Sequence, residues 1–285
     1  MAAPSFVMGA VAYDPKVVTI WDGFRTWLRD QGFDFDFVLY SNYERQVEEL
    51  VAGRIQAAWN SPLAWVRAAR LAPRAGTRVE ALTMRDTDLD LTSVVVVRAD
   101  SPVTEPAGLR GRVVATGAVD SPQATLIPLA HLAARGLRAG TDFTLRRFDV
   151  GVGLHGDHIG GERDAAVALA RDEVDAACMI DANHLLFARD GTLAPGSTRI
   201  IAQTAPYDHC NMTVVASPSV LVARFGELLL AMDYADPAVR PLLDLEGLTR
   251  WCPGRASGYG ALTAAVDQLG FYDGAGVITA ADYRP

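Results

Sequence analysis

The chain has 285 residues, half of them hydrophobic, which is enough for a substantial core and predicts about two domains. Its 34 acidic residues outnumber the 26 lysine and arginine residues, and the resulting formal net charge of −8 argues against a surface that binds nucleic acid or anionic lipid. The longest apolar runs, such as 94–97 and 228–232, fall far short of the roughly 20 residues that span a bilayer, so we predict no transmembrane segment.

The three cysteines lack C-x-x-C spacing and predict small core residues rather than a disulfide framework. Residues 1–6 precede the first strand-like segment without the basic, apolar and small-residue regions of a secretory signal. We therefore expect either a cytoplasmic protein or one that reaches the periplasm or the extracellular face after removal of a leader.

Hydrophobic periodicity predicts strands that alternate with helices. A first series comprises a strand at 7–11, a helix with apolar residues at helical spacing between 17 and 28, a strand at 35–40, a helix at 43–51 and a strand at 55–59. A β-branched run at 92–97 predicts a buried strand. The later elements are a strand at 112–116, helices at 125–135 and 164–171, a strand at 175–180, a helical start at 183–188, strands at 199–203 and 212–216, and a helix at 221–232.

This alternation is typical of α/β proteins. We expect two discontinuous lobes between which the chain crosses near Val97 and near Thr204, one comprising residues 1–97 plus 205–285 and the other residues 98–204. The loops at the carboxyl ends of the strands would then face each other across a cleft, where open α/β sheets usually bind their ligands. Closure of the lobes would hinge at the two crossings.

Four segments of the chain carry a family resemblance. They are NYERQVEELVAGRIQAAWNSPLAW at 42–65, TSVVVVRADSP at 92–102 with DSPQAT at 120–125, GERDAAVALARDEVDAACMID at 161–181, and VVASP at 214–218. In this order they resemble the phosphate/phosphite/phosphonate substrate-binding proteins of ABC transporters. The resemblance implies the type II periplasmic-binding fold, an α/β fold with two mixed sheets flanked by helices and a cleft between two lobes.

The resemblance implies ligand contacts at the start of the helix after residue 120, at Ser121, Gln123, Ala124 and Thr125. Hydroxyl groups and unpaired backbone N–H groups at a helix start can bind an oxyanion. Helix capping alone is the alternative role of these residues.

On the other side of the cleft, the resemblance implies contacts from Tyr43, Asn60 and Ser61. Tyr13, in the loop after the first strand, is a similar candidate. Amide and hydroxyl groups of this kind can orient a polar ligand, although an exposed tyrosine in such a loop is also common.

Three further candidates follow from the glycine-led segment. Arg163 stands where many family members carry a histidine, and its planar guanidinium suits a carboxylate or phosphate. Asp181 ends a predicted strand and can accept hydrogen bonds from the ligand or cap the next helix. His184 would line the cleft or pack one turn into that helix.

Two polar clusters suggest chemistry beyond binding. His155 and His158 flank a carboxylate in a glycine-rich loop, but their spacing is not a metal signature, and we predict neither a metal nor a cofactor. His209 and Cys210 suggest an imidazole that activates a thiol. Neighbouring side chains on an extended segment point to opposite faces, so we expect these two not to form a dyad.

We therefore predict a solute-binding protein that closes on a small polar or anionic molecule, like a phosphonate, phosphate or carboxylate, and serves an ABC-type uptake system. Its partners would be the ligand and an ABC permease, and the protein would act as a monomer. The alternative is a leaderless cytoplasmic enzyme on the same fold, of the decarboxylase or cofactor-biosynthesis type, in which His155, His158, His209 or Cys210 would be catalytic.

Overall fold

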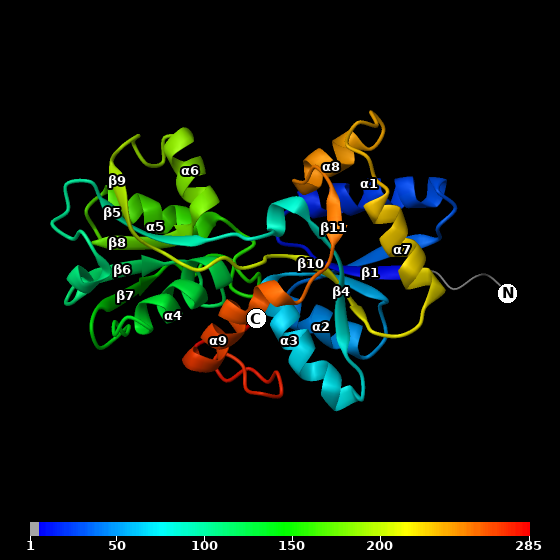
Figure 1. Cartoon of the computed structure of the whole chain (residues 1–285), viewed down its shortest axis with the longest axis horizontal. Coiled ribbons are helices and arrows are strands. Elements are labelled where there is room, and N and C mark those ends of the chain that lie inside the picture. Colours follow the sequence, from blue (N-terminus) through cyan, green and yellow to red (C-terminus); the bar gives the residue numbers. More distant parts are fainter. Residues whose placement is uncertain (1–5) are drawn as a thin grey trace.

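The computed structural model describes residues 6–285, which form two α/β lobes joined by extended segments (Figure 1). The predicted absence of a secretory signal concerns mainly residues 1–5, which lie outside the described residues. We call the lobe with the six-stranded sheet lobe I and the lobe with the five-stranded sheet lobe II. Both sheets are mixed and flanked by helices, which confirms the predicted fold class.

The sheet of lobe I has the strand order β11-β4-β10-β3-β1-β2. Its strands are β1 (Phe6–Val11), β2 (Phe35–Tyr40), β3 (Ala57–Asn60), β4 (Val79–Arg85), β10 (Asn211–Val215) and β11 (Trp251–Pro253). Strand β1 runs parallel to β2 and β3, whereas β10 is antiparallel to β3 and β4. The helices of this lobe are α1 (Lys16–Asp30), α2 (Tyr43–Val51), α3 (Pro62–Leu71), α7 (Val220–Leu230) and α8 (Arg240–Glu246).

Helices α1 and α2 form where the sequence predicts them because each has an apolar stripe at helical spacing. Helix α1 buries Val17, Ile20, Trp21, Phe24 and Leu28 against the sheet. Helix α2 begins at an N-cap, Asn42, whose side chain accepts a hydrogen bond from the backbone N–H of Arg45. The start of α2 is thereby fixed at the edge of the cleft.

The sheet of lobe II has the order β7-β6-β8-β5-β9. Its strands are β5 (Ser93–Arg98), β6 (Val113–Thr116), β7 (Thr144–Arg147), β8 (Ala176–Ile180) and β9 (Thr198–Gln203). Its helices are α4 (Ile127–Ala133), α5 (Gly160–Ala170) and α6 (Asp181–Arg189), and a π-helical turn over Pro122–Leu126 precedes α4. Within residues 6–285, no helix has both the length and the apolar character needed to cross a membrane.

The two crossing segments pair with each other between the lobes. Leu91 and Tyr207 exchange two backbone hydrogen bonds of 2.8 Å. Because β5 already belongs to the sheet of lobe II, the chain crosses before Ser93, and the predicted boundary after Val97 is wrong. The β-branched run 92–97 predicts a buried strand but does not indicate which lobe it belongs to. Its pairing with β8 and β9 places it in the sheet of lobe II.

The C-terminal segment contacts both lobes. Helix α9 (Gly260–Leu269) packs against α3 of lobe I and against α4 and the π-helical turn of lobe II (Figure 1). Tyr283 near the end of the chain is completely buried. The predicted assignment of residues 205–285 to lobe I alone therefore does not hold for this segment, which forms a third connection between the lobes.

Candidate functional site

A cavity of about 300 Å³ lies between the two lobes. Lobe I and its crossing segment contribute Tyr13, Lys16, Arg85, Thr87, Asp88, Leu91 and His209, and lobe II contributes Gln123, Gly156, Asp157, Ile159, Ile180, Ala182 and Asn183. These residues come from loops and element ends beyond the strands, the region where the sequence predicts the ligand cleft. The lining is mainly polar and carries both positive and negative groups.

Lys16 is the only lysine in the chain, and it lies at this cavity. It is the first residue of α1, is exposed, and has no ion-pair partner among residues 6–285. Its ammonium nitrogen lies 5.7 Å from the centre of the Tyr13 ring. A strongly hydrated, mobile ammonium group at the cavity can pair with an incoming oxyanion.

Arg85, at the end of β4, is held by two carboxyl groups. Its Nε and Nη2 donate to the two oxygens of Asp88 at 2.6 and 2.8 Å, and its Nη1 lies 3.3 Å from Oε1 of Glu246. Burial opposes ionisation of Asp88, but the adjacent Arg85 outweighs it and lowers the pKa of that carboxyl to about 2. Burial raises the pKa of Glu246 to about 7 against the pull of Arg85.

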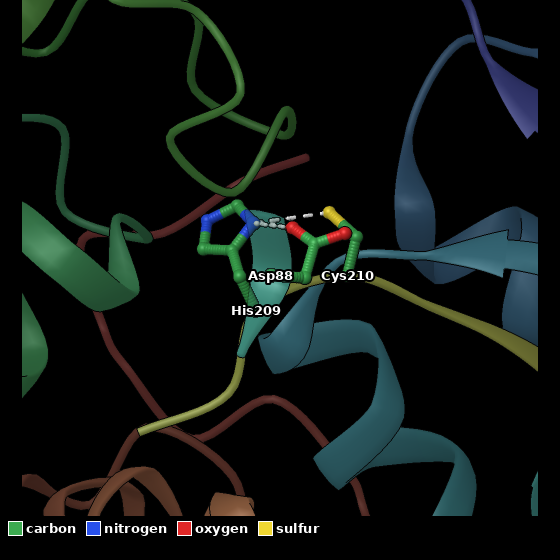
Figure 2. A group of neighbouring side chains, drawn as sticks. All are labelled: Asp88, His209 and Cys210. Atoms are coloured by element: carbon green, nitrogen blue, oxygen red, sulfur yellow. Dashed lines mark hydrogen bonds and ion pairs between the residues drawn. The ribbon is translucent and has the colours of Figure 1, made fainter. Parts of the chain in front are cut away.

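His209 and Cys210 lie next to Asp88 in the wall of lobe I. Figure 2 shows the His209 imidazole beside both the Asp88 carboxylate and the Cys210 thiol. The distance from Nδ1 of His209 is 3.1 Å to the thiol sulfur and 3.5 Å to Oδ1 of Asp88. The prediction that these two side chains point to opposite faces is wrong, because β10 begins only at Asn211 and residues 209–210 are not in an extended strand.

The environment of Cys210 does not favour a nucleophile. Its side chain packs in the core of lobe I and is 3% exposed. Burial, reinforced by the carboxyl group of Asp157, raises the pKa of the thiol well above its usual value. The thiol is therefore protonated at neutral pH, whereas a catalytic cysteine must be ionised.

Lobe II faces the cavity with amide and carboxyl groups. Gln123 is 4% exposed; its Nε2 donates to the carbonyl oxygen of Gly156 at 2.7 Å, and its Oε1 is buried without a hydrogen-bond partner. Asn183 donates to the buried carboxyl group of Glu162 at 2.9 Å. Asp157 accepts a hydrogen bond from the hydroxyl of Tyr43, across the boundary between the lobes.

His155 is a buried contact between the lobes. It belongs to the loop between β7 and α5 of lobe II, and its Nδ1 lies 2.7 Å from Oγ of Ser61 while its Nε2 lies 3.0 Å from Oε1 of Glu44. The same Glu44 oxygen accepts hydrogen bonds from the hydroxyls of Tyr272 and Tyr283. Burial opposes ionisation of Glu44, but these partners outweigh it and lower the pKa of the carboxyl to about 2.

The structure therefore separates the two histidines of the glycine-rich loop. His155 has both ring nitrogens occupied by lobe I side chains, whereas His158 is exposed and its Nδ1 accepts from the backbone N–H of Gly160. The two imidazoles do not converge on one position. They form neither a common metal site nor an acid–base pair.

Of the predicted ligand contacts, Tyr13 and Gln123 line the cavity, and Tyr43 reaches it through Asp157. Asn60 and Ser61 are completely buried behind the cavity, where Asn60 donates to Thr213 and Ser61 caps α3. The amide of Asn60 and the hydroxyl of Ser61 therefore hold the end of β3 and the start of α3 in place. The spacing of the motif alone does not reveal this structural role.

The polar groups at the helix start after residue 120 also make mainly internal contacts. Ser121 caps the π-helical turn by accepting from the backbone N–H of Ala124, and Thr125 and Ala124 are buried outside the cavity lining. Within this segment only Gln123 lines the cavity. The hydrogen bond of Ser121 is therefore the helix cap that the sequence offered as the alternative role.

The glycine-led segment also differs from the expectation. Arg163 lies outside the cavity lining, pairs with Asp190 at 2.8 Å and stacks on the Phe187 ring. Asp181 accepts from the Thr92 hydroxyl and from the N–H of Ala182, and His184 contacts Thr198; neither lines the cavity. At the start of α5 the side chain that faces inward is Glu162, because helical rotation turns Arg163 outward.

Sequence reasoning missed Lys16, Arg85, Asp88, Asp157 and Asn183 in the cavity lining. One signal was visible, since a single lysine among 26 basic residues is a strong compositional bias. The other residues come from a strand end, a short turn, a loop and a helix start, and only the packing of the two lobes brings them together.

Comparisons with known proteins agree with this architecture. The family model described as ABC transporter, phosphonate, periplasmic substrate-binding protein matches residues 8–259. No curated protein sequence matches the chain. The enzyme alternative receives no support from the family match.

Several solved structures share the fold. PhnD1 of Prochlorococcus marinus in complex with methylphosphonate is 15% identical, with a TM-score of 0.68 over 93% of this chain and 98% of that chain. A protein from Xanthomonas citri bound to ATP is 18% identical, with a TM-score of 0.69 over 94% and 98%. A binding protein of a phosphonate transporter from Pseudomonas aeruginosa is 13% identical, with a TM-score of 0.60 over 93% and 95%. The chain belongs to the family of periplasmic substrate-binding proteins of phosphonate ABC transporters.

Proposed function

We propose that the chain binds a small solute with a phosphonate-like oxyanion in the cavity between the lobes and delivers it to an ABC permease. The cavity of about 300 Å³ is at the lower end of the usual range for ligand sites, so the solute is small. Polar groups from both lobes line it, which allows one molecule to be held from two sides.

The position of Lys16 is the observation that carries this proposal. Many arginines of the chain are held in ion pairs, as Arg85 is by Asp88. The only lysine lies at the cavity and pairs with no carboxylate in the part of the chain that the structure describes. A charge-assisted contact between this ammonium group and an oxyanion contributes on the order of 1.5–3 kcal/mol when water is excluded, and less at an exposed position.

Calorimetry with methylphosphonate, phosphite, phosphate, methylsulfonate and acetate tests the proposal, with glycerol as a neutral control. We expect one oxyanion to bind and the substitution Lys16→Met to raise its Kd about tenfold, which corresponds to roughly 1.4 kcal/mol. Lys16→Arg keeps the positive charge and should weaken oxyanion binding less than Lys16→Met does. Arg74→Met removes an exposed cation outside this cavity and should leave the Kd unchanged.

The single lysine also permits a direct measurement. Acetylation with an amine-reactive ester can modify only Lys16 and the chain terminus, and mass spectrometry measures each rate separately. We expect the bound solute to slow acetylation of Lys16 but not of the terminus. Equal rates with and without a solute that binds would place the oxyanion elsewhere.

The same proposal includes a monomeric receptor on the outer side of the membrane. Light scattering of the purified chain should give the mass of one copy, and cell fractionation of the protein expressed from its own gene should recover it outside the cytoplasm. Recovery only in the cytoplasm would contradict the transport role even if the solute binds.

A further inference from the structure

Three different metal-binding side chains converge in the wall of lobe I. The ligand atoms of Asp88, His209 and Cys210 all lie within 4.8 Å of one another (Figure 2). All three residues are nearly buried, at 1%, 9% and 3% exposure. The proposed function does not use this group, and its chemistry differs from that of an oxyanion site.

The backbone holds the three side chains in place before any ligand arrives. Asp88 lies in the short turn after β4, and His209 and Cys210 directly precede β10. The backbone N–H of His209 donates to the carbonyl oxygen of Asp88 at 2.8 Å, which joins the two segments. A preformed arrangement of this kind reduces the ordering cost of binding.

The distances fit a small tetrahedral ion. Zinc–sulfur and zinc–nitrogen bonds of about 2.3 and 2.0 Å place sulfur and nitrogen ligands about 3.5 Å apart in a tetrahedral site. The imidazole Nδ1 lies 3.1 Å from the sulfur and 3.5 Å from the nearer carboxylate oxygen. The carboxylate and thiol ligand atoms lie within 4.8 Å of each other, so side-chain adjustment of up to roughly an ångström would complete this geometry.

The charges of this wall also favour a cation. The carboxyl groups of Asp88 and Asp157 lie near the thiol, Asp157 Oδ1 at 4.0 Å from its sulfur. Glu246 adds a third carboxyl group to this wall, where Arg85 pairs with it and with Asp88. Arg85 occupies one lone pair on each Asp88 oxygen, and each oxygen retains another. Hydrogen bonds of this kind commonly orient a carboxylate ligand from outside a metal site.

We propose that Asp88, His209 and Cys210 bind a borderline-soft divalent cation of the zinc class, with its fourth position facing the cavity. Binding requires the neutral imidazole to present Nδ1 and the Cys210 thiol to release its proton to solvent, leaving the thiolate as a ligand. Because Asp88 and His209 line the cavity while Cys210 lies behind them, the open position is on the solute side. A metal ion there would add a second positive group beside Lys16.

Cobalt and zinc titrations of the purified, metal-stripped chain test the proposal without any organic solute. We expect one equivalent of Co²⁺ to produce the near-ultraviolet absorption of a thiolate–cobalt bond, and one equivalent of Zn²⁺ to abolish it. Zinc binding should release a proton, measurable in a weakly buffered solution. Competition with a chromophoric chelator gives the Zn²⁺ affinity.

The variants Cys210→Ala and His209→Gln should each weaken Zn²⁺ binding more than the roughly 10- to 100-fold that the loss of an outer partner costs. Cys252→Ala removes a partly exposed thiol on β11 and is the matched control. Circular dichroism shows whether each variant folds.

Absence of the thiolate–cobalt absorption in the folded wild-type chain would overturn the proposal, as would an unchanged Zn²⁺ affinity in folded Cys210→Ala. Failure of this test leaves oxyanion binding at Lys16 unaffected when the calorimetry with the oxyanions is carried out on the metal-stripped chain. Loss of oxyanion binding likewise leaves the cobalt spectrum unchanged.

Discussion

His155 of lobe II reaches Glu44 of lobe I, with 3.0 Å between the imidazole Nε2 and the carboxylate Oε1. This contact is buried and connects the loop before α5 to helix α2. The same carboxylate oxygen also accepts hydrogen bonds from the hydroxyls of Tyr272 and Tyr283 in the C-terminal segment, so it connects three parts of the chain. The contact between the lobes and the position of the chain end therefore depend on the same carboxylate.

The substitution His155→Ala should lower the free energy of unfolding by about 2–4 kcal/mol. It leaves the hydroxyl of Ser61 and a buried carboxylate with fewer partners, and each such loss costs about 1–3 kcal/mol. Urea unfolding measures the change. His158→Ala, in the same loop but exposed, should stay within about 0.5 kcal/mol of wild type; equal effects of the two substitutions would contradict the buried bridge.

Glu44 makes the stability depend on acid pH. Its pKa is lowered in the folded chain, from 4.5 to about 2, so its contribution is complete above about pH 4.5 and is lost as the pH falls towards 2. The shift corresponds to about 3 kcal/mol. The unfolding free energy of wild type should therefore fall more between pH 6 and pH 3 than that of Glu44→Gln. Glu105→Gln, in an exposed loop, should behave as wild type.

Arg163→Ala should leave the solute Kd within about twofold of wild type, because its guanidinium pairs with Asp190 outside the cavity. Gln123→Ala removes an amide from the lining and should raise the Kd about 3- to 10-fold. Calorimetry on the same solute compares them. A larger rise in Kd for Arg163→Ala than for Gln123→Ala would support Arg163 as the anion contact that the sequence predicts.

We expect the lobes to close about the paired segments at Leu91 and Tyr207. Leu91→Pro removes the N–H that donates to Tyr207 and should lower the unfolding free energy by about 1–3 kcal/mol, whereas Leu91→Ala keeps both backbone bonds. Small-angle scattering with and without solute measures closure. An unchanged radius of gyration in wild type at saturating solute would contradict a hinge at this position.

The sequence by itself determined the alternating elements of both lobes. The strand Phe35–Tyr40 and the helix Tyr43–Val51 have the predicted bounds, because alternation and helical spacing of apolar residues are local signals. The family resemblance likewise rests on segments that keep their order along the chain. Local patterns were insufficient for the C-terminal segment, whose helix α9 and buried Tyr283 were not predicted.

Only the tertiary structure decided which polar side chains face the cavity. Arg163 and Glu162 are neighbours in sequence, yet helical rotation places the arginine outside and the carboxyl group inside. His155, a catalytic candidate only under the enzyme alternative, bridges the lobes through Ser61 and Glu44, which are about a hundred residues away along the chain. Such pairings depend on lobe packing over long sequence separations, which residue type and spacing do not encode.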